Sequence, residues 1–177
     1  TLDIYAPFAH RFGLGNVKWE LEDLSFKYLN PEAYDQLKRA LKTKRREREA
    51  YIERAMAPIR GRLEEEGISF RINGRAKHLY SIYNKMRMQN KSVDEIHDLI
   101  AIRVLLATDN PNDCFTVYGL ISEIFTPVPE QFKNYISVPK KNGYQSIHTT
   151  VIGPEGRRIE VQIRTEKMHE VAERGVA

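Results

Sequence analysis

The sequence is poor in cysteine and lacks any long apolar run, and each shortage excludes a class of protein. Its 177 residues contain one cysteine, Cys114, so an internal disulfide is excluded and a reducing compartment is expected. No apolar run reaches the length of a membrane span, and no charged and then apolar leader precedes a small-residue cleavage site. We therefore expect a cytoplasmic protein with no membrane partner.

The composition fits one globular domain with a helical segment attached. Apolar residues make up 41% of the chain and charged residues 29%, which is typical of a packed core under a well-solvated surface. The formal net charge of +4 favours an anionic partner: a nucleotide, a nucleic acid or an anionic membrane surface. Charge alone does not choose among these three.

Hydrophobic periodicity divides the chain into a helical first part and a second part in which strands and helices alternate. Residues 1–29 are expected to form helices, and Pro31 begins a long helix that ends near Gly61 or Gly67. The strands expected after it are 68–72, 99–106, 135–138, 146–152 and 158–164, and the helices are 77–89, 112–125 and one that starts at 166. Because residues 153–156 form a hairpin-turn pattern, the last two strands should be antiparallel. The fold class expected is α/β of the α+β type, with a mixed sheet flanked by helices.

The expected long helix is strongly basic, with ten basic and three acidic residues between positions 38 and 62. One interpretation is a solvated face on which arginines pair with glutamates along the helix. The other is a surface that binds nucleic acid or a regulator. The first is favoured, because no aromatic platform accompanies the charges.

A first candidate site runs from Gly74 to Lys85, where a strand is expected to give way to a helix. Lys77, Ser81 and Lys85 are spaced four residues apart, so they share one helix face and form a row of donors. Arg75 adds a guanidinium in the preceding loop, close to the helix N-terminus, where backbone N–H groups favour phosphate. We therefore predict phosphate binding, with a solvated basic helix and a capping glycine as the alternative. The Gly-x-x-x-x-Gly-Lys run of a Walker loop is absent from the sequence.

A second candidate site combines two carboxylates. Asp98 introduces one predicted strand, and Glu160 lies within another, on the same face as Gln162 and Arg164. Two carboxylates beside a phosphate site fit an oxygen-rich Mg²⁺ site, whereas the alternative is that both pair with arginines such as Arg103 or Arg164. The residues alone leave these two open. A metal phosphohydrolase built on the His-Asp pair at positions 97 and 98 is disfavoured, because the other histidines lack metal-ligand spacing.

A third candidate site is the stretch KKNGYQSIHTT at positions 140–150. Lys140 and Lys141 can meet phosphates, and an Asn-Gly pair turns the chain. Tyr144 then offers a flat ring on which a base can stack, for about 1–3 kcal/mol, and His148 follows on the next strand. An edge hairpin with protective lysines would explain the charges but not the whole cluster.

Four segments in this order resemble the synthetase domain of the long RelA/SpoT-homologue enzymes of the stringent response: GRAKHLYSIYNKM, HDLIAIRVL, FKNYISVPKKNGYQSIHTT and IEVQIRTEKMHEVAERGVA. On this resemblance, residues 68–177 are the synthetase domain, 31–67 a basic helical linker and 1–30 the end of the upstream hydrolase half. The resemblance implies a nucleotidyltransferase-like fold and a (p)ppGpp synthetase. Such an enzyme uses Mg²⁺ to transfer pyrophosphate from ATP to the 3′-hydroxyl of GDP or GTP, and it releases AMP.

The resemblance also implies a role for each candidate residue. It makes Asp98 and Glu160 the catalytic pair that holds Mg²⁺, with Glu160 also helping to deprotonate the attacking hydroxyl. The ATP-binding residues that it implies are Arg75, Lys77, Ser81, Lys85 and Arg103, with the two arginines beside the adenine. The GDP- or GTP-binding residues that it implies are Lys133, Lys140, Asn142, Tyr144, His148 and Gln162, with Tyr144 stacked on the guanine.

Some properties stay open at this point. Family members carry Arg-x-Lys-Asp or Glu-x-Asp-Asp where this chain has Gln131-Phe132-Lys133-Asn134, so Lys133 matches the basic type while the preference for GDP or GTP is undecided. A ribosome would be reached through C-terminal regions that follow in the family, and the oligomeric state is unknown. The alternative function is an RNA- or ribosome-binding module that uses residues 38–62 and has no catalysis of its own.

Overall fold

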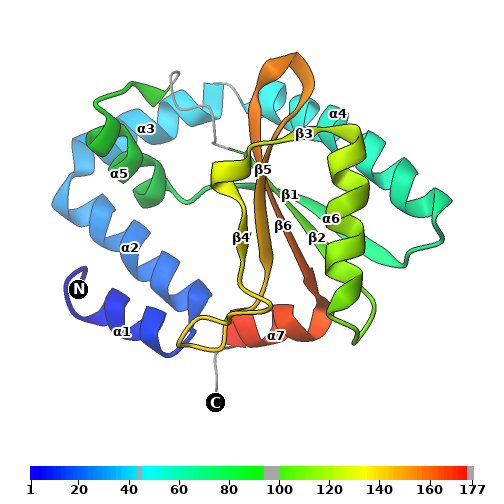
Figure 1. The fold of residues 1–177 in the computed structure, drawn as a ribbon. Coiled ribbons are helices and arrows are strands. Elements are labelled where there is room, and N and C mark those ends of the chain that lie inside the picture. Colours follow the sequence, from blue (N-terminus) through cyan, green and yellow to red (C-terminus); the bar gives the residue numbers. More distant parts are fainter. Residues whose placement is uncertain (44, 94–99, 175–177) are drawn as a thin grey trace.

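The structure, a computed structural model, describes residues 1–43, 45–93 and 100–174, and of residues 75 and 76 it describes the backbone. Figure 1 shows a central sheet with helices on both sides. The helices are α1 Tyr5–Arg11, α2 Gly15–Leu29, α3 Pro31–Thr43, α4 Arg45–Glu65, α5 Leu79–Gln89, α6 Asn112–Ile124 and α7 Glu166–Arg174. The strands are β1 Phe70–Ala76, β2 Ile100–Leu106, β3 Thr126–Pro127, β4 Lys133–Asn134, β5 Ile147–Ile152 and β6 Arg158–Thr165.

The sheet is mixed, which confirms the predicted fold class. Its order is β1-β2-β6-β5-β3, with β4 also paired to β5. Strands β2 and β6 run parallel, whereas the other pairs are antiparallel. The turn at residues 153–156 joins β5 to β6 as predicted, with Glu155 in the left-handed conformation at φ 59°. Since β2 and β6 lie in the middle of the order, residues on their polar face are held by strands on both sides.

Two hydrophobic cores form on opposite sides of the sheet. The larger one, here the sheet core, packs α4 and α6 against the apolar face of the strands and includes Ile102, Val161 and Ile163. The smaller one, here the helix core, joins α2, α3 and α5 around Phe26, Leu37 and Ile82. In Figure 1 the helices of the helix core lie to the left of the sheet, and α4 and α6 lie to its right.

The long helix predicted after Pro31 is described as two helical segments, α3 and α4, which lie on the two sides of residue 44. Helix α3 ends at Thr43 and belongs to the helix core through Leu37. Helix α4 begins at Arg45 and places Tyr51, Ala55, Ile59 and other residues of one face in the sheet core. Residue 44 lies outside the described residues, so a single continuous helix stays a prediction. The helical residues before and after it cover two different surfaces.

The predicted strand at residues 135–138 is wrong. Those residues form a turn, and the strand in this region is β4, Lys133–Asn134. The side-chain oxygen of Asn134 accepts hydrogen bonds from the backbone N–H groups of Ile136 and Ser137, both at 3.0 Å. An Asn side chain that binds the backbone two and three residues later favours a turn over an extended strand.

Strand β1 continues further than predicted, and Gly74 lies inside it. Gly74 pairs with Ile102 of β2, so it is not part of a phosphate-binding loop. A Cβ atom at this position would lie 2.1 Å from Cγ2 of Ile52 on α4. The glycine is therefore required for the close packing of α4 on the sheet. Helix α5 begins only at Leu79, after His78 in an extended conformation.

Cys114 behaves as its position in a predicted helix suggests. It is fully buried on α6, in the sheet core. Burial raises the pKa of its thiol to about 12, so the thiolate is not formed near neutral pH. The residue is an inert member of the core.

Candidate active site

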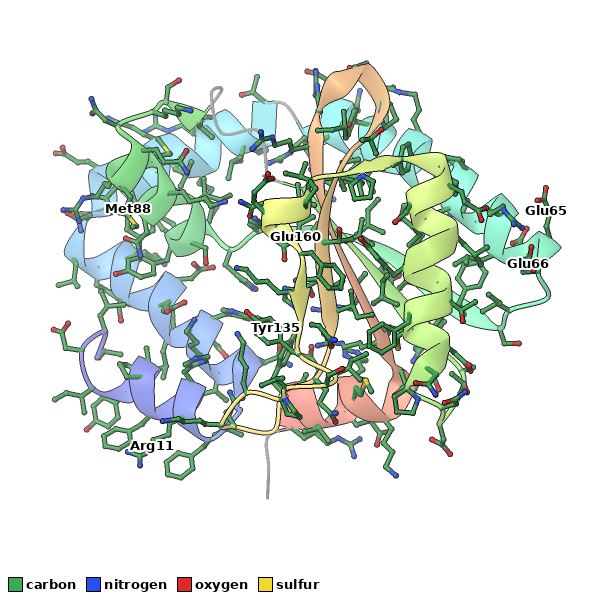
Figure 2. All side chains as sticks on the ribbon, viewed as in Figure 1. Arg11, Glu65, Glu66, Met88, Tyr135 and Glu160 are labelled. Carbon is green, nitrogen blue, oxygen red and sulfur yellow. The ribbon has the colours of Figure 1, made fainter. Side chains whose placement is uncertain are left out.

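Two neighbouring cavities open on the polar face of the sheet, toward the helices of the helix core. The lysine cavity, of about 260 Å³, is lined by Trp19, Lys77, His78, Ser81, Lys85, Ala101, Glu160 and Gln162. The tyrosine cavity, of about 210 Å³, includes Lys18, Trp19, Arg103, Lys140, Asn142, Tyr144, His148, Gln162, Arg164 and Glu173 among its lining residues. Figure 2 labels Glu160 and Tyr135 near the centre of the molecule in this region.

The lysine cavity gathers the cations predicted to grip phosphate, although not in the predicted way. Ser81 and Lys85 lie on α5, but Lys77 precedes the helix, so the three residues do not share one helix face. They converge nonetheless, since all three line the cavity. Burial, and then the charge of Lys77, lowers the pKa of Lys85 to about 8. A lysine pushed toward neutrality by a neighbouring cation marks a place where an anion would be stabilised.

Helix α2 fixes the start of α5. The N-cap residue His78 provides no capping side chain, and instead the carboxylate of Asp23 on α2 accepts a 2.8 Å hydrogen bond from the N–H of Tyr80. The other oxygen of Asp23 lies 3.7 Å from Nδ1 of His78. A carboxylate at a helix N-terminus satisfies an otherwise unpaired donor and favours the helix dipole. The helix that carries Ser81 and Lys85 is thus held by a residue far away in the sequence.

Glu160 on β6 is the charged residue at the boundary of the two cavities. Its Oε2 lies 3.1 Å from Nζ of Lys77, its Oε1 accepts a 2.8 Å hydrogen bond from Gln162, and the same Oε1 lies 3.6 Å from Nδ1 of His148. Burial raises the pKa of Glu160, but Lys77 and the hydrogen bond from Gln162 outweigh it, and the pKa falls to about 2. Among the described residues the salt-bridge partner of Glu160 is Lys77, whereas Arg103 and Arg164, the arginines named as alternatives, pair with Glu173.

Asp98, the predicted partner of Glu160, lies outside the described residues, and so does the side chain of Arg75. Among the described residues no group of three or more His, Cys, Asp or Glu side chains is placed to hold a metal ion. Glu160 by itself suits Mg²⁺, because it is an ionised oxygen donor at a cavity wall. The two-carboxylate site therefore stays a prediction.

In the tyrosine cavity, the ring of Tyr144 is joined to His148. A 2.7 Å hydrogen bond links the Tyr144 hydroxyl to Nε2 of His148, and the Nζ atom of Lys140 lies 5.3 Å from the centre of the Tyr144 ring. Burial, and then the cations around the site, lowers the pKa of His148 to about 4 despite the nearby Glu160. A neutral imidazole with its proton on Nδ1, toward Glu160, would accept the tyrosine hydroxyl on Nε2.

Two further residues of the predicted acceptor set lie at the rim of this region. The side-chain amide of Asn142 donates a 2.9 Å hydrogen bond to the carbonyl of His10 on α1, so it ties the turn to the N-terminal helices. Lys133 is exposed on β4 opposite His148, and its charge contributes to the lowered pKa of His148 without lining either cavity.

Arg103 and Gln162 are placed differently from the predicted sets. Arg103, expected beside ATP, lines the tyrosine cavity with the predicted acceptor residues, where its Nη1 lies 3.4 Å from Oε1 of Glu173. Gln162, expected beside the acceptor, lines both cavities. Within the described residues, the buried Nε of Arg103 has no hydrogen-bond partner, so Arg103 keeps an unsatisfied donor.

Several lining residues were not predicted from the sequence. Trp19 lines both cavities, and Arg164, which is 1% exposed, lies 2.6 Å from His169 and 3.4 Å from Glu173. The alternation along β6 placed Arg164 on the polar face, but it gave no role. No sequence signal marked Trp19, because a tryptophan on an apolar helix face is typical of a core.

The basic segment is a solvated face with ion pairs, as favoured from the sequence. Arg45 pairs with Glu49 at 2.7 Å, and Arg60 pairs with Glu53 at 2.8 Å. Arg54 reaches the β5–β6 turn through Glu155, also at 2.8 Å. These arginines are therefore already matched with carboxylates, which weakens the case for an RNA-binding surface.

None of the described helices is long and apolar enough to cross a membrane. This finding agrees with the lack of long apolar runs in the sequence.

Comparisons with known proteins bear on the same residues. Residues 74–177 match the family described as the region found in RelA / SpoT proteins. Over its whole length the chain is 49% identical to a GTP pyrophosphokinase of Myxococcus xanthus and covers 23% of that protein. It is 46% identical to a guanosine-3′,5′-bis(diphosphate) 3′-pyrophosphohydrolase of Aquifex aeolicus, again over 100% of the chain, and covers 25% of that protein. The chain thus spans about a quarter of the length of these relatives, whose names describe opposite reactions.

A solved structure is similar to the fold. The crystal structure of the small alarmone synthetase 1 from Bacillus subtilis bound to its product pppGpp matches with a TM-score of 0.54 and 27% identity. The match covers 78% of this chain and 78% of that one. The structural likeness thus reaches beyond residues 74–177, into the helical first part of the chain.

Proposed function

The chain belongs to the RelA/SpoT family, and from this premise we propose that it is a (p)ppGpp synthetase domain. It transfers pyrophosphate from ATP to the 3′-hydroxyl of GDP or GTP with the help of Mg²⁺, and AMP leaves. The observation that carries this proposal is the meeting of two cavities at one ionised carboxylate: Glu160 contacts Lys77 of the lysine cavity and His148 of the tyrosine cavity. Two nucleotide sites that share such a boundary suit a transfer from one nucleotide to the other.

In this proposal the lysine cavity binds the triphosphate of ATP. Lys77 and Lys85 offset the negative charge that would otherwise repel an approaching hydroxyl, and Ser81 donates a hydrogen bond between them. The low pKa of Lys85 supports this role, because a phosphate nearby would restore its full charge. Mg²⁺, held by Glu160 and by Asp98 as the resemblance implies, would supply further charge stabilisation on the phosphates.

The tyrosine cavity binds the acceptor. Tyr144 and His148 form a hydrogen-bonded pair on its wall, and Lys140 lies over the aromatic rings of Tyr135 and Tyr144, at 4.5 and 5.3 Å from their centres. Arg103 and Arg164 add cationic character, of which Glu173 neutralises part. An aromatic wall with cations around it fits a base with phosphates attached.

Glu160 has two proposed roles, as a ligand of Mg²⁺ and as a base, and its contact with Lys77 affects its strength as a base. With a pKa of about 2 it is a weak base while Lys77 stays at 3.1 Å. When ATP draws Lys77 toward a phosphate, Glu160 loses its main counter-charge, so its pKa rises and it becomes better able to take the proton of the acceptor hydroxyl. Binding of the donor thus prepares the carboxylate for the acceptor.

The test is a transfer assay with labelled ATP. The protein is incubated with γ-labelled ATP, GDP and Mg²⁺, and the products are separated. We expect label in a guanine nucleotide and AMP in equal amounts, and we expect competition between GDP and GTP to show the preferred acceptor. Lys85→Ala should weaken the binding of ATP by about 1.5–3 kcal/mol and the binding of GDP much less.

Two results would contradict the proposal. Binding of both nucleotides without transfer would show that this part of the protein is not catalytic by itself. Binding of RNA with a steep salt dependence, and no binding of ATP or GDP, would favour the RNA-binding alternative. The assignment of residues 1–30 to an upstream hydrolase half, of 31–67 to a linker and of 68–177 to the synthetase domain remains part of this proposal.

A further inference from the structure

Trp19 occupies a special place in the site, although it lies outside the segment that matches the family. It comes from α2, and it lines both the lysine cavity and the tyrosine cavity. Gln162 is the other residue that lines both, from the sheet side. The boundary between the cavities is therefore made by a polar side chain of the sheet and an aromatic side chain of the N-terminal helices.

The indole is held in place from several directions. Its ring stacks on the imidazole of His78, with the ring centres 4.6 Å apart and the planes inclined by 21°. Gly15, one turn earlier on α2, allows α2 to approach α7 beside the indole: a Cβ there would lie 3.1 Å from the carbonyl oxygen of Ala172 on α7 and at an ordinary contact distance of 3.7 Å from the indole. Asp23, one turn later, holds the start of α5. The position of Trp19 is thus defined by α2, α5 and α7 together.

The lysine cavity needs a surface for the nucleoside as well as for the phosphates. Lys77, Lys85 and Glu160 provide charge and hydrogen bonds, but none of these three side chains offers a flat ring for a purine. Among the described residues that line this cavity, Trp19 has the largest aromatic surface. Purine bases pack on such rings regardless of their identity, because every base has a π-face.

We propose that Trp19 is a nucleotide-binding residue: its indole packs against the nucleoside of the nucleotide in the lysine cavity and forms the partition from the nucleotide in the tyrosine cavity. This inference rests on the proposed function, since it takes the two cavities as nucleotide sites. It means that the N-terminal helices complete the active site, and that residues 74–177 alone would lack one of its walls.

The protein offers a direct probe, because Trp19 is its single tryptophan. A non-hydrolysable ATP analogue and GDP are titrated separately into the intact chain, and binding is measured by calorimetry while tryptophan emission is recorded. We expect both nucleotides to change the emission and to shield the indole from collisional quenching by acrylamide. We expect the ATP analogue to shield it more strongly than GDP.

Two variants of Trp19 test whether a loss of affinity comes from a lost contact with the nucleotide or from a folding defect. Trp19→Ala should bind the ATP analogue roughly tenfold more weakly, whereas Trp19→Phe should keep most of the affinity because it keeps a ring face. Val17→Ala is the matched control, since Val17 lies on the same helix, is 46% exposed and lines neither cavity. Its affinity should equal that of the unchanged protein, and circular dichroism should show equal helix content in all variants.

The outcomes distinguish this inference from the function on which it rests. If calorimetry shows that neither nucleotide binds, the proposed function is overturned and this inference with it. If both bind while acrylamide quenching and emission stay unchanged, the inference alone is overturned. The same holds if Trp19→Ala binds the ATP analogue as tightly as the Val17→Ala control.

Discussion

The sheet core and the helix core differ in how much they bury, and the candidate active site lies between them. Among the described residues the sheet core contains twenty buried residues, most of them Ile, Val and Leu, whereas the helix core contains three, which half-buried residues including several aromatic rings surround. Phe26 at its centre is in ring contact with Tyr34, Tyr80 and Tyr83. Because buried apolar contacts set local stability, the helix core should open at a lower free energy than the sheet core.

The residues of the candidate site are divided between elements of the sheet core and elements of the helix core. Glu160, Gln162 and His148 lie on strands whose other face is packed in the sheet core. Ser81 and Lys85 lie on α5, whose buried residue Ile82 belongs to the helix core. The groups proposed to hold the donor phosphates are therefore on the less buried unit, and the groups around the acceptor are on the more buried one. Movement of α2 and α5 over a fixed sheet is the expected way to admit a nucleotide.

The largest effect is expected on turnover, from a substitution in the candidate active site that lies in neither core. Glu160→Gln keeps the size of the side chain but removes the charge at the boundary of the cavities, so turnover should fall by about 10³-fold or more, which is about 4 kcal/mol of transition-state stabilisation. Neither core is touched, so the variant should fold, although its melting temperature should be lower because Lys77 loses its partner carboxylate. Transfer assays and melting curves on the same sample check this. Near-normal turnover in a folded variant would remove Glu160 from the catalytic role.

The comparison itself is tested by one substitution made in each core. Ile163 and Ile82 are 0% and 1% exposed. Ile163→Ala should lower the free energy of global unfolding by about 3–4 kcal/mol, whereas Ile82→Ala should cost nearer 2 kcal/mol, because its surroundings are less fully buried and collapse more easily. Ile82→Ala should also weaken the binding of ATP, whereas Ile163→Ala should leave ATP affinity unchanged. Denaturant unfolding and calorimetry measure the two effects, and equal losses of stability would break the comparison.

A somewhat smaller effect on stability is expected at acidic pH, and it arises from His148 on β5. In the folded protein the pKa of His148 is about 4, below the value of about 6.5 for an exposed histidine. Between these two pH values the unfolded chain binds more protons than the folded one, so stability should fall as the pH falls, by about 2–3 kcal/mol in total. Below pH 4.5 the protonation of Glu160, whose folded pKa is about 2, should add a second loss.

Unfolding free energies at pH 7, 5.5 and 4.5 check the first loss. His148→Gln should reduce the dependence between pH 6.5 and 4.5 to the part that comes from His10 and His169, whose pKa values burial also lowers, and it should leave the loss at lower pH. If the variant keeps the slope of the unchanged protein, the titration belongs to another group.

A substitution at Asp23 of α2 should act through its contact with the start of α5. Asp23→Ala removes the acceptor for the N–H of Tyr80, and loss of such a cap typically costs about 1 kcal/mol. Because the cap holds the helix of Ser81 and Lys85, ATP binding should weaken while GDP binding stays constant. Asp23→Asn keeps an acceptor oxygen and should retain most of the affinity. Calorimetry with each nucleotide decides, and an equal loss for both would place the effect in folding.

The smallest effect is expected from removal of the Tyr144 hydroxyl group. Tyr144→Phe loses the hydrogen bond to His148 but keeps the ring, so acceptor affinity should fall by about 0.5–1 kcal/mol. Tyr144→Ala also loses the ring face and should cost about 1–3 kcal/mol. Lys140→Ala should weaken acceptor binding in a salt-dependent way, because that contact is between charges. A Tyr144→Ala protein that binds GDP normally would exclude stacking on this ring.

The sequence predicts best the parts that depend on local patterns. The two faces of β6 follow from strict alternation, and the β5–β6 turn follows from its Gly-Pro-Glu-Gly composition. The strand predicted at 135–138 fails for an equally local reason, since one side-chain oxygen of Asn134 reorganises the backbone after it. A period-two pattern does not reveal that hydrogen bond.

Other features depend on contacts between distant segments, and no local pattern contains them. The cap that Asp23 provides for α5, and the place of Trp19 between the cavities, exist only because α2 packs against α5 and α7. The resemblance placed Arg103 beside the adenine of ATP, but Arg103 lines the tyrosine cavity, where it contacts Glu173. The described structure does not test the pairing of Asp98 with Glu160.

Gly74 has a consequence for genetic screens. Every replacement introduces a Cβ 2.1 Å from Cγ2 of Ile52, so Ile52 must shift and missense alleles of this codon should lower the amount of folded protein. A screen scored by growth would then group Gly74 with Lys77 and Glu160, although it contacts no nucleotide in the arrangement proposed above. Protein abundance separates the two kinds of allele, and a shortened side chain at position 52 should act as a second-site suppressor for Gly74→Ala. The same suppressor should do nothing for an allele of Glu160.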